Sequence, residues 1–209
     1  MVKIKICGIT NVEDAKVAVA AGADALGFVM YRKSPRFVEA VVVKSIVATL
    51  PPFVLPVGVF VNEEPERVRT LVDECGLVLA QLHGDETASY CQDLGRPVMK
   101  ALRLKDRGTF LALAEFQGRA NVRGFLIDAF SDQAYGGTGQ TVDWTLAQEA
   151  ARSTPVVLAG GLTPTNVAEA IACVRPHGVD VSSGVELSPG KKDHGKVKAF
   201  IEAARLVAV

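Results

Sequence analysis

The feature that most constrains the fold is a repeated alternation of short apolar runs with helical segments. Each apolar run is rich in Val, Ile, Leu or Phe and is bounded by Gly, Pro or polar residues. The runs are nearly continuous rather than alternating with polar residues, which is typical of parallel strands buried on both faces. They predict eight strands, at residues 3–7, 24–29, 54–61, 77–82, 97–102, 123–129, 155–160 and 178–183.

A helical segment follows each predicted strand. The first begins after Asn11, a favoured N-cap residue, and ends at Gly22, a favoured C-terminal stop. In a later one, Thr163 is the expected cap and Pro164 the first helical residue. The repeat of roughly 25 residues is an ordinary length for one βα unit.

Eight βα units with no long polar linker predict one domain, residues 1–209, of the α/β class, folded as a (β/α)₈ TIM barrel. A doubly wound open sheet is the alternative. It usually has fewer strands, and its first βα turn often carries the pattern G-x-G-x-x-G, which is absent here.

Composition excludes several classes of partner and location. Lys plus Arg and Asp plus Glu both number 23, and no basic run indicates a nucleic-acid or membrane surface. We find neither a signal-peptide pattern nor an apolar run of the roughly 18 residues that a membrane helix needs. The four cysteines (Cys7, Cys75, Cys91 and Cys173) show no metal-binding spacing. They are expected to be free thiols in a reducing cytoplasm.

In a (β/α)₈ barrel, chemistry occurs at the carboxyl ends of the strands. Unusual residues do follow the predicted strands, and Cys7 stands at the tip of the first one, before a glycine. The other clusters are "MYRKSPRF" (30–37), "NE" (62–63), "HGD" (83–85), "DAFSDQAYGGTGQ" (128–140), "GGLTP" (160–164) and "SSGVELSPGKKD" (182–193).

The last two clusters are rich in glycine and hydroxyl groups. Glycine lets backbone N–H groups approach an anion, and a helix N-terminus adds partial positive charge. Loops after strands seven and eight are the usual phosphate site of this fold, so we expect a phosphate monoester substrate. The alternative is that these glycines only form tight turns. The predicted phosphate contacts are Gly139, Gly160, Gly161, Ser182, Ser183 and Gly184. Gly139 belongs to "YGGTG" (135–139), which we interpret as a flap over the ligand.

Taken together, the motifs resemble one known family. "KICGIT", "GFVMYRKSPRFV", "VGVFVN", "QLHGDE", "LIDAFSDQAYGGTGQTVDW", "LAGGLTPTNV" and "GVDVSSGVELSPGKKD" occur in the order found in phosphoribosylanthranilate isomerases. The resemblance implies an isomerase of tryptophan biosynthesis. Its reaction is the Amadori rearrangement of N-(5-phosphoribosyl)anthranilate to 1-(2-carboxyphenylamino)-1-deoxyribulose 5-phosphate, without a metal or organic cofactor. The expected partner is this small phosphosugar, and both a monomer and a homodimer remain open.

The resemblance also implies roles for individual residues. The reaction needs an acid to open the ribose ring and a base to remove the C2′ proton, and the family positions are Asp128 and Cys7. Asp128 must then carry a proton, and Cys7 must ionise. Arg36 corresponds to the ligand of the anthranilate carboxylate. His83 matches a residue that lines the pocket, and Asp180 one that faces the ribose hydroxyls. For both, a purely structural hydrogen bond is an equal alternative.

Two rival functions remain at this point. One is another phosphosugar barrel, such as a ribulose-phosphate epimerase or the histidine-pathway isomerase, which is expected to carry an aspartate where Cys7 stands. The other is a non-catalytic sensor of a phosphometabolite. A sensor has no need for both an acid and a base, so the presence of Cys7 and Asp128 argues against it.

Overall fold

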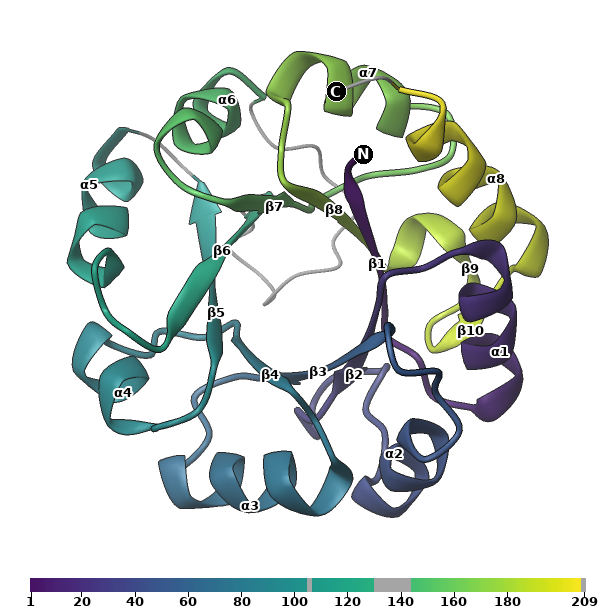
Figure 1. Ribbon diagram of the computed structural model, residues 1–209, viewed down its shortest axis with the longest axis horizontal. Coiled ribbons are helices and arrows are strands. Elements are labelled where there is room, and N and C mark those ends of the chain that lie inside the picture. The colour runs from purple at the N-terminus through teal and green to yellow at the C-terminus, as the bar shows by residue number, and fades with distance from the viewer. Residues whose placement is uncertain (105–106, 130–143, 208–209) are drawn as a thin grey trace.

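Eight parallel strands, hydrogen-bonded in sequence order, close into a barrel in the computed structural model, which describes residues 1–104, 107–129 and 144–207 (Figure 1). The closed barrel predicted from the sequence is therefore confirmed, and the open sheet is excluded. The strands are β1 (Lys3–Cys7), β2 (Ala25–Val29), β3 (Leu55–Phe60), β4 (Leu79–Leu82), β5 (Val98–Leu104), β6 (Val122–Ala129), β7 (Val156–Leu158) and β8 (Gly178–Val181).

The helices form a ring outside the strands (Figure 1). They are α1 (Val12–Ala21), α2 (Ala40–Val47), α3 (Pro65–Cys75), α4 (Ala88–Asp93), α5 (Arg107–Phe116), α6 (Trp144–Ser153), α7 (Val167–Val174) and α8 (His194–Arg205). Helix α1 has the predicted caps: the Asn11 side chain accepts a hydrogen bond from the Asp14 N–H, and Gly22 is left-handed at φ 103°. In the described part of the chain, no helix combines the length and apolarity of a membrane span.

Two apolar clusters divide the interior. The larger one joins the outward side chains of the strands, such as Ile4 and Ile6, to buried residues of the helices, such as Val43 and Val68. The smaller one fills the barrel itself with Val57, Met99, Ala101, Leu126 and Ala159. Because side chains alternate along a strand, Lys5 and Cys7 point to the opposite face from Ile4 and Ile6, into the barrel.

Two local features differ from the sequence prediction. Helix α7 begins at Val167 rather than after Thr163, because Thr163 and Asn166 form a turn in which the Thr163 N–H donates to Asn166 Oδ1 at 2.8 Å. The segment after β8 contains a 3₁₀ helix (Ser183–Val185) and a hairpin of β9 (Glu186–Ser188) and β10 (Lys191–Lys192). Gly190, at φ 80°, allows this tight hairpin, which returns Lys192 to the end of the barrel.

Candidate active site

A cavity of about 380 Å³ opens at the carboxyl end of the barrel. It brings together residues from six strands and from the loops that follow the strands. The predicted site residues among its lining are Cys7, Arg36, His83, Asp128, Gly160, Gly161, Asp180, Ser182 and Ser183. Gly184 lies beside the cavity, against the backbone of Leu162 and Thr163. Gly139 and the predicted flap fall outside the described residues.

Cys7 ends β1 and is 7 % exposed. Burial raises the pKa of its thiol, and the Asp180 carboxylate adds to the rise, whereas the ammonium groups of Lys5 and Lys192 oppose it. In the free protein the thiol is thus mainly protonated near neutrality. The fraction of thiolate, and with it the basicity of the site, increases as the pH rises towards the pKa of Cys7.

Asp128, in β6, meets His83 across the barrel interior. The distance from His83 Nε2 to Asp128 Oδ2 is 3.2 Å, and Gln81 Nε2 lies 2.9 Å from His83 Nδ1. The three side chains are almost fully buried. The Gln81 Oε1 atom has no hydrogen-bond partner within the described residues. His83 thus contacts the predicted acid directly.

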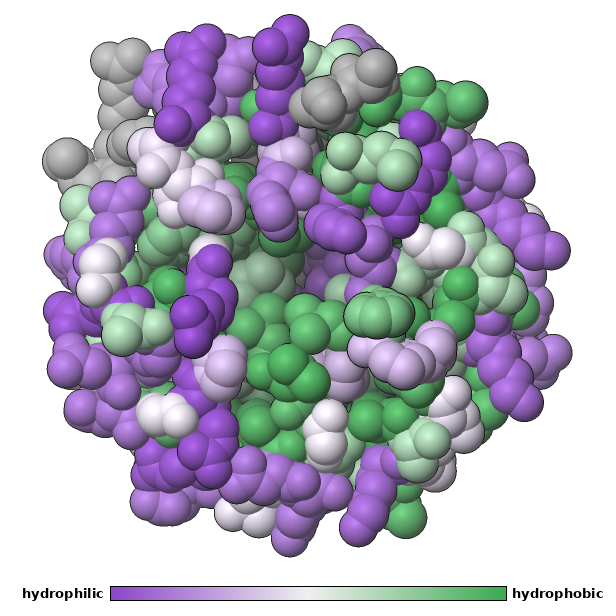
Figure 2. Space-filling view, in the orientation of Figure 1, coloured by the Kyte–Doolittle hydropathy of each residue, from purple (hydrophilic) through white to green (hydrophobic). Residues whose placement is uncertain are grey.

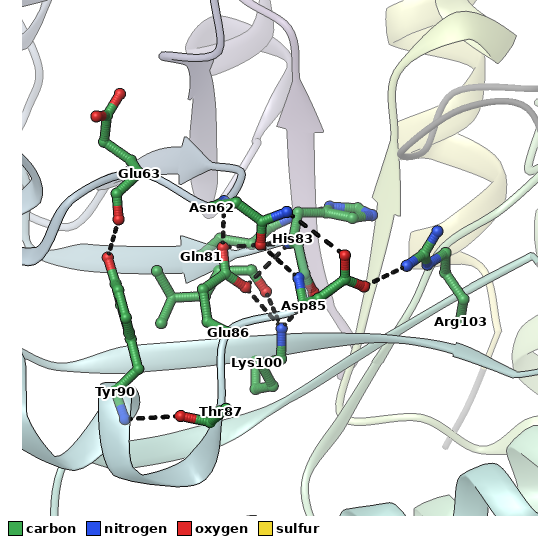
Figure 3. A network of polar contacts seen from close by, with 12 residues as sticks. Asn62, Glu63, Gln81, His83, Asp85, Glu86, Thr87, Tyr90, Lys100 and Arg103 are labelled. Carbon is green, nitrogen blue, oxygen red and sulfur yellow. Dashed lines mark hydrogen bonds and ion pairs between the residues drawn. The ribbon is translucent and has the colours of Figure 1, made fainter.

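A buried ion pair supports the loop that carries His83 (Figure 3). The Glu86 carboxylate accepts hydrogen bonds from Lys100 Nζ at 2.7 Å, from the Asn62 N–H at 2.8 Å and from the Gly84 N–H at 3.0 Å. Lys100 Nζ also donates to the Gly84 carbonyl at 2.7 Å. These contacts join the loops after β3 and β4 to β5, and they fix the backbone on which His83 stands.

Arg36 reaches the cavity from the loop after β2 and is held by a residue of the hairpin. Its Nε and Nη2 groups donate to the two carboxylate oxygens of Glu186 at 2.9 and 2.8 Å. Glu186 also accepts from Lys192 Nζ at 2.9 Å. Burial alone would raise the pKa of Glu186, but the hydrogen bond from Arg36 and the charge of Lys192 keep it below its usual value. Arg36 Nη1 has no hydrogen bond to the described part of the chain.

The two loops predicted to bind phosphate lie side by side at the cavity. Gly160 and Gly161 have φ values of 85° and 63°, a backbone conformation that L side chains rarely adopt. The Ser182 Oγ atom is buried and has no partner among the described residues. Ser183 begins the short 3₁₀ helix that follows β8. Glycine backbone and a buried hydroxyl that has no partner within the described residues thus line one side of the cavity.

Asp180 lies at the inner wall of the cavity, where its Oδ1 atom accepts from Lys5 Nζ at 2.9 Å. Sequence reasoning missed Lys5, and also Gln81, Glu186 and Lys192. For Lys5 a signal existed, since it stands two residues before Cys7 and therefore on the same face of the strand. Gln81 carries the same signal, since it stands two residues before His83 and contacts it. For Glu186 and Lys192, the contacts with Arg36 and Asp14 join distant segments, and no local pattern indicates them.

The fold and the site define the class of protein: a (β/α)₈-barrel enzyme with ionisable side chains and glycine-rich loops around one cavity at the carboxyl ends of its strands. The family model of N-(5′-phosphoribosyl)anthranilate isomerase matches residues 4–203. The N-(5′-phosphoribosyl)anthranilate isomerase of Trichlorobacter lovleyi is 52% identical over 206 residues, which are 98% of each chain. The chain belongs to this family.

Solved structures agree with the assignment. One is a phosphoribosylanthranilate isomerase in complex with reduced 1-(o-carboxyphenylamino)-1-deoxyribulose 5-phosphate, with a TM-score of 0.88 and 42% identity over 99% of this chain and all of the other. Another shows monomers generated from the dimeric enzyme of Thermotoga maritima, with a TM-score of 0.87 and 40% identity over the same shares. The chain is an isomerase of tryptophan biosynthesis, as the motifs implied, and the rival phosphosugar barrels and the sensor are set aside.

Proposed function

We propose that Cys7 is the general base and Asp128 the general acid of the Amadori rearrangement. The observation that carries this proposal is that both side chains line one cavity, on strands that are not neighbours in the barrel. Asp128 protonates the ribose ring oxygen, so that the ring opens to a Schiff base. Cys7 then removes the C2′ proton, and the resulting enolamine tautomerises to the ketone. Separation of the two groups keeps them from neutralising each other.

The neighbours of Asp128 provide a way to present its proton. The Gln81 Nε2–H group donates to His83 Nδ1, so that His83 Nε2–H donates to Asp128 Oδ2. With Oδ2 held by His83, a proton carried on Oδ1 can be delivered to the ring oxygen of the sugar. Gln81 and His83 then orient the acid without taking up its proton.

Arg36 is proposed to bind the anthranilate carboxylate, and Glu186 to hold the guanidinium in place. The Nε–Nη2 edge is occupied by Glu186, so the carboxylate would meet Nη1. The phosphate is proposed to sit between the loops after β7 and β8, on the backbone of Gly160 and Gly161 and the hydroxyl of Ser182.

Replacement of Arg36 by methionine should raise KM by about 10- to 100-fold with a much smaller change in kcat, because a charge-assisted hydrogen bond to the substrate is lost. Steady-state kinetics of the purified variant measure this. Arg32→Met is the matched control, since that arginine belongs to the same loop but is exposed and paired with Glu39. An unchanged KM in Arg36→Met would remove this residue from the carboxylate site.

We also propose that the chain, as one domain over residues 1–209, forms a homodimer through the amino end of the barrel. Phe53 is 96 % exposed there, beside a mainly apolar cavity of about 490 Å³ lined by residues such as Leu79 and Val157. In Figure 2, apolar residues gather at the centre of the view, surrounded by hydrophilic ones. A projecting phenyl ring beside an apolar cavity on one face can pair with a second copy of that face around a two-fold axis.

Phe53→Ser should weaken such a dimer at least about 100-fold, because two buried rings are lost per dimer. Sedimentation equilibrium over a range of protein concentrations measures this. Val41→Ser, which changes an exposed apolar residue of α2, should leave the association unchanged. A wild-type chain that stays monomeric at high concentration contradicts the dimer, without bearing on the catalytic proposal.

The activity itself is tested by following the loss of phosphoribosylanthranilate fluorescence with and without the purified chain. The catalysed decay must exceed the spontaneous one and must yield the carboxyphenylamino-deoxyribulose phosphate. Decay at the spontaneous rate would overturn the proposed mechanism. Location in the cytoplasm remains a prediction from the sequence.

A further inference from the structure

A lysine lies buried in the barrel directly behind the proposed base. Lys5 is 5 % exposed, and its side chain shares the inward face of β1 with Cys7, one layer deeper in the barrel. Its neighbours in the barrel interior are mainly apolar. A lysine without a partner would be costly at such a place. Asp180 is its partner: the Lys5 Nζ to Asp180 Oδ1 distance is 2.9 Å, and both side chains are more than nine-tenths buried.

Gly27 provides the space in which Lys5 and Cys7 meet. It stands opposite Cys7 in the register of β1 and β2. A methyl group at Gly27 would lie 2.7 Å from Cys7 Sγ and 2.9 Å from Lys5 Nζ, closer than real Cβ atoms approach other atoms. The thiol and the ammonium group therefore crowd the same small volume above this glycine, and no side chain at position 27 fits between them.

We propose that Lys5 is a positioning residue of the reaction, whose ammonium group stabilises the thiolate form of Cys7 while Asp180 holds the lysine in place and Gly27 leaves them room. Lys5 does not need to touch the substrate in this role. The proposal rests on Cys7 being the base, and it names the cation that makes a buried thiol usable as one.

The charges around Cys7 agree with this arrangement. The charged groups that act on the thiol are Lys5 on its own strand, Asp180 on β8 and Lys192 on β10; β2 contributes only Gly27 at this level. Burial alone would lower the pKa of Lys5, but Asp180 and Cys7 outweigh it and raise that pKa, so the lysine stays charged. Burial lowers the pKa of Lys192, which is engaged with Glu186. Of the two lysines near the thiol, Lys5 is thus the one whose surroundings favour the charged form more strongly.

A purely structural role for the Lys5–Asp180 pair makes a different prediction. Buried ion pairs often contribute little net stability, and loss of one partner destabilises the fold around the other. If the pair supported packing alone, loss of either residue should loosen the structure around Cys7 and change its alkylation rate in the same direction. If Lys5 stabilises the thiolate, loss of Lys5 and loss of Asp180 should instead have opposite effects on the reactivity of Cys7.

The test is the rate at which iodoacetamide alkylates Cys7, read by mass spectrometry of the peptide that contains it, from pH 6 to the highest pH at which the fold persists. Because only the thiolate reacts, Lys5→Met should slow alkylation at neutral pH by at least about tenfold and shift the profile to higher pH. Lys3→Met is the matched control, since Lys3 lies on the same face of the same strand but is 61% exposed and paired with Asp24. It should leave the rate unchanged.

Asp180→Asn should speed alkylation of Cys7, because a negative charge that disfavours the thiolate is removed. Slower alkylation in Lys5→Met with faster alkylation in Asp180→Asn supports the proposal. An unchanged rate in a folded Lys5→Met protein, or slowing of both variants alike, overturns it. If Lys5→Met does not fold, as judged by circular dichroism, Asp180→Asn decides alone: faster alkylation supports the proposal, and an equal or slower rate overturns it.

The alkylation assay needs no substrate, so it separates this inference from the proposed mechanism. Failure of Cys7 as the base would show in the activity of a Cys7 variant and would leave the alkylation profiles intact. In the isomerase assay, the ascending limb of kcat/KM against pH should move to higher pH in Lys5→Met, which a lysine that only supports packing would not cause.

Discussion

Replacing Cys7 with serine is expected to lower kcat by about 10² to 10⁴-fold, the usual contribution of a general base. The two side chains are similar in size, so the end of β1 and its pairing with Gly27 should persist. A hydroxyl group, however, does not ionise near neutral pH, and the neighbouring ammonium groups cannot change that. Steady-state kinetics by the fluorescence assay measure the loss, and thermal unfolding monitors the fold.

Cys173→Ser is the matched control for this substitution. Cys173 is a half-buried thiol on α7, away from the cavity, and its replacement should leave kcat unchanged. Binding of a product analogue to Cys7→Ser should remain close to that of the wild type, because the proposed roles of Arg36 and the phosphate loops are untouched. If the variant retained more than about a tenth of kcat, Cys7 would not be the base.

Asp128→Asn should cause a comparable fall in kcat, again about 10² to 10⁴-fold. An amide has no acidic proton to give to the ring oxygen. Its Oδ1 atom can still accept a hydrogen bond from His83 Nε2–H, so the contact observed at 3.2 Å should be kept and the fold should hold. Single-turnover kinetics would place the loss in the step that opens the ring.

The control for Asp128→Asn is Asp73→Asn, which makes the same chemical change on the outer surface of α3, where Asp73 pairs with Arg96. Its kcat should not change, since exposed ion pairs contribute little even to stability. Substantial turnover by Asp128→Asn, with the fold intact, would mean that another group protonates the sugar.

Most of the fold could be predicted because each strand is an apolar run between strong breakers. The bounds of β1 agree to the residue, and those of the other strands agree to within two residues. Local patterns failed where distant segments decide the structure. The hairpin of β9 and β10 is held by contacts of Glu186 and Lys192 with Arg36 and Asp14, and no short-range signal indicates them.

The predicted site could be located because the barrel topology alone gathers the strand ends. Nine of the named site residues line one cavity, although their roles remain proposals. What the sequence could not give is the set of partners: that Asp180 meets Lys5, that His83 meets Asp128, or that Glu186 orients Arg36. Each of these pairs is far apart in sequence, and only the closed barrel brings them together.

The separation of the apolar interior into two clusters has a consequence for the evolution of such an enzyme. Most of the buried apolar residues lie between the strands and the helices, whereas few fill the barrel. Most of the apolar burial that stabilises the fold therefore lies in the layer between the strands and the helices, away from the proposed catalytic residues. Residues at the mouth of the barrel can be exchanged for others with new chemistry while the shell keeps the molecule folded, so that one architecture can acquire a different reaction by few substitutions.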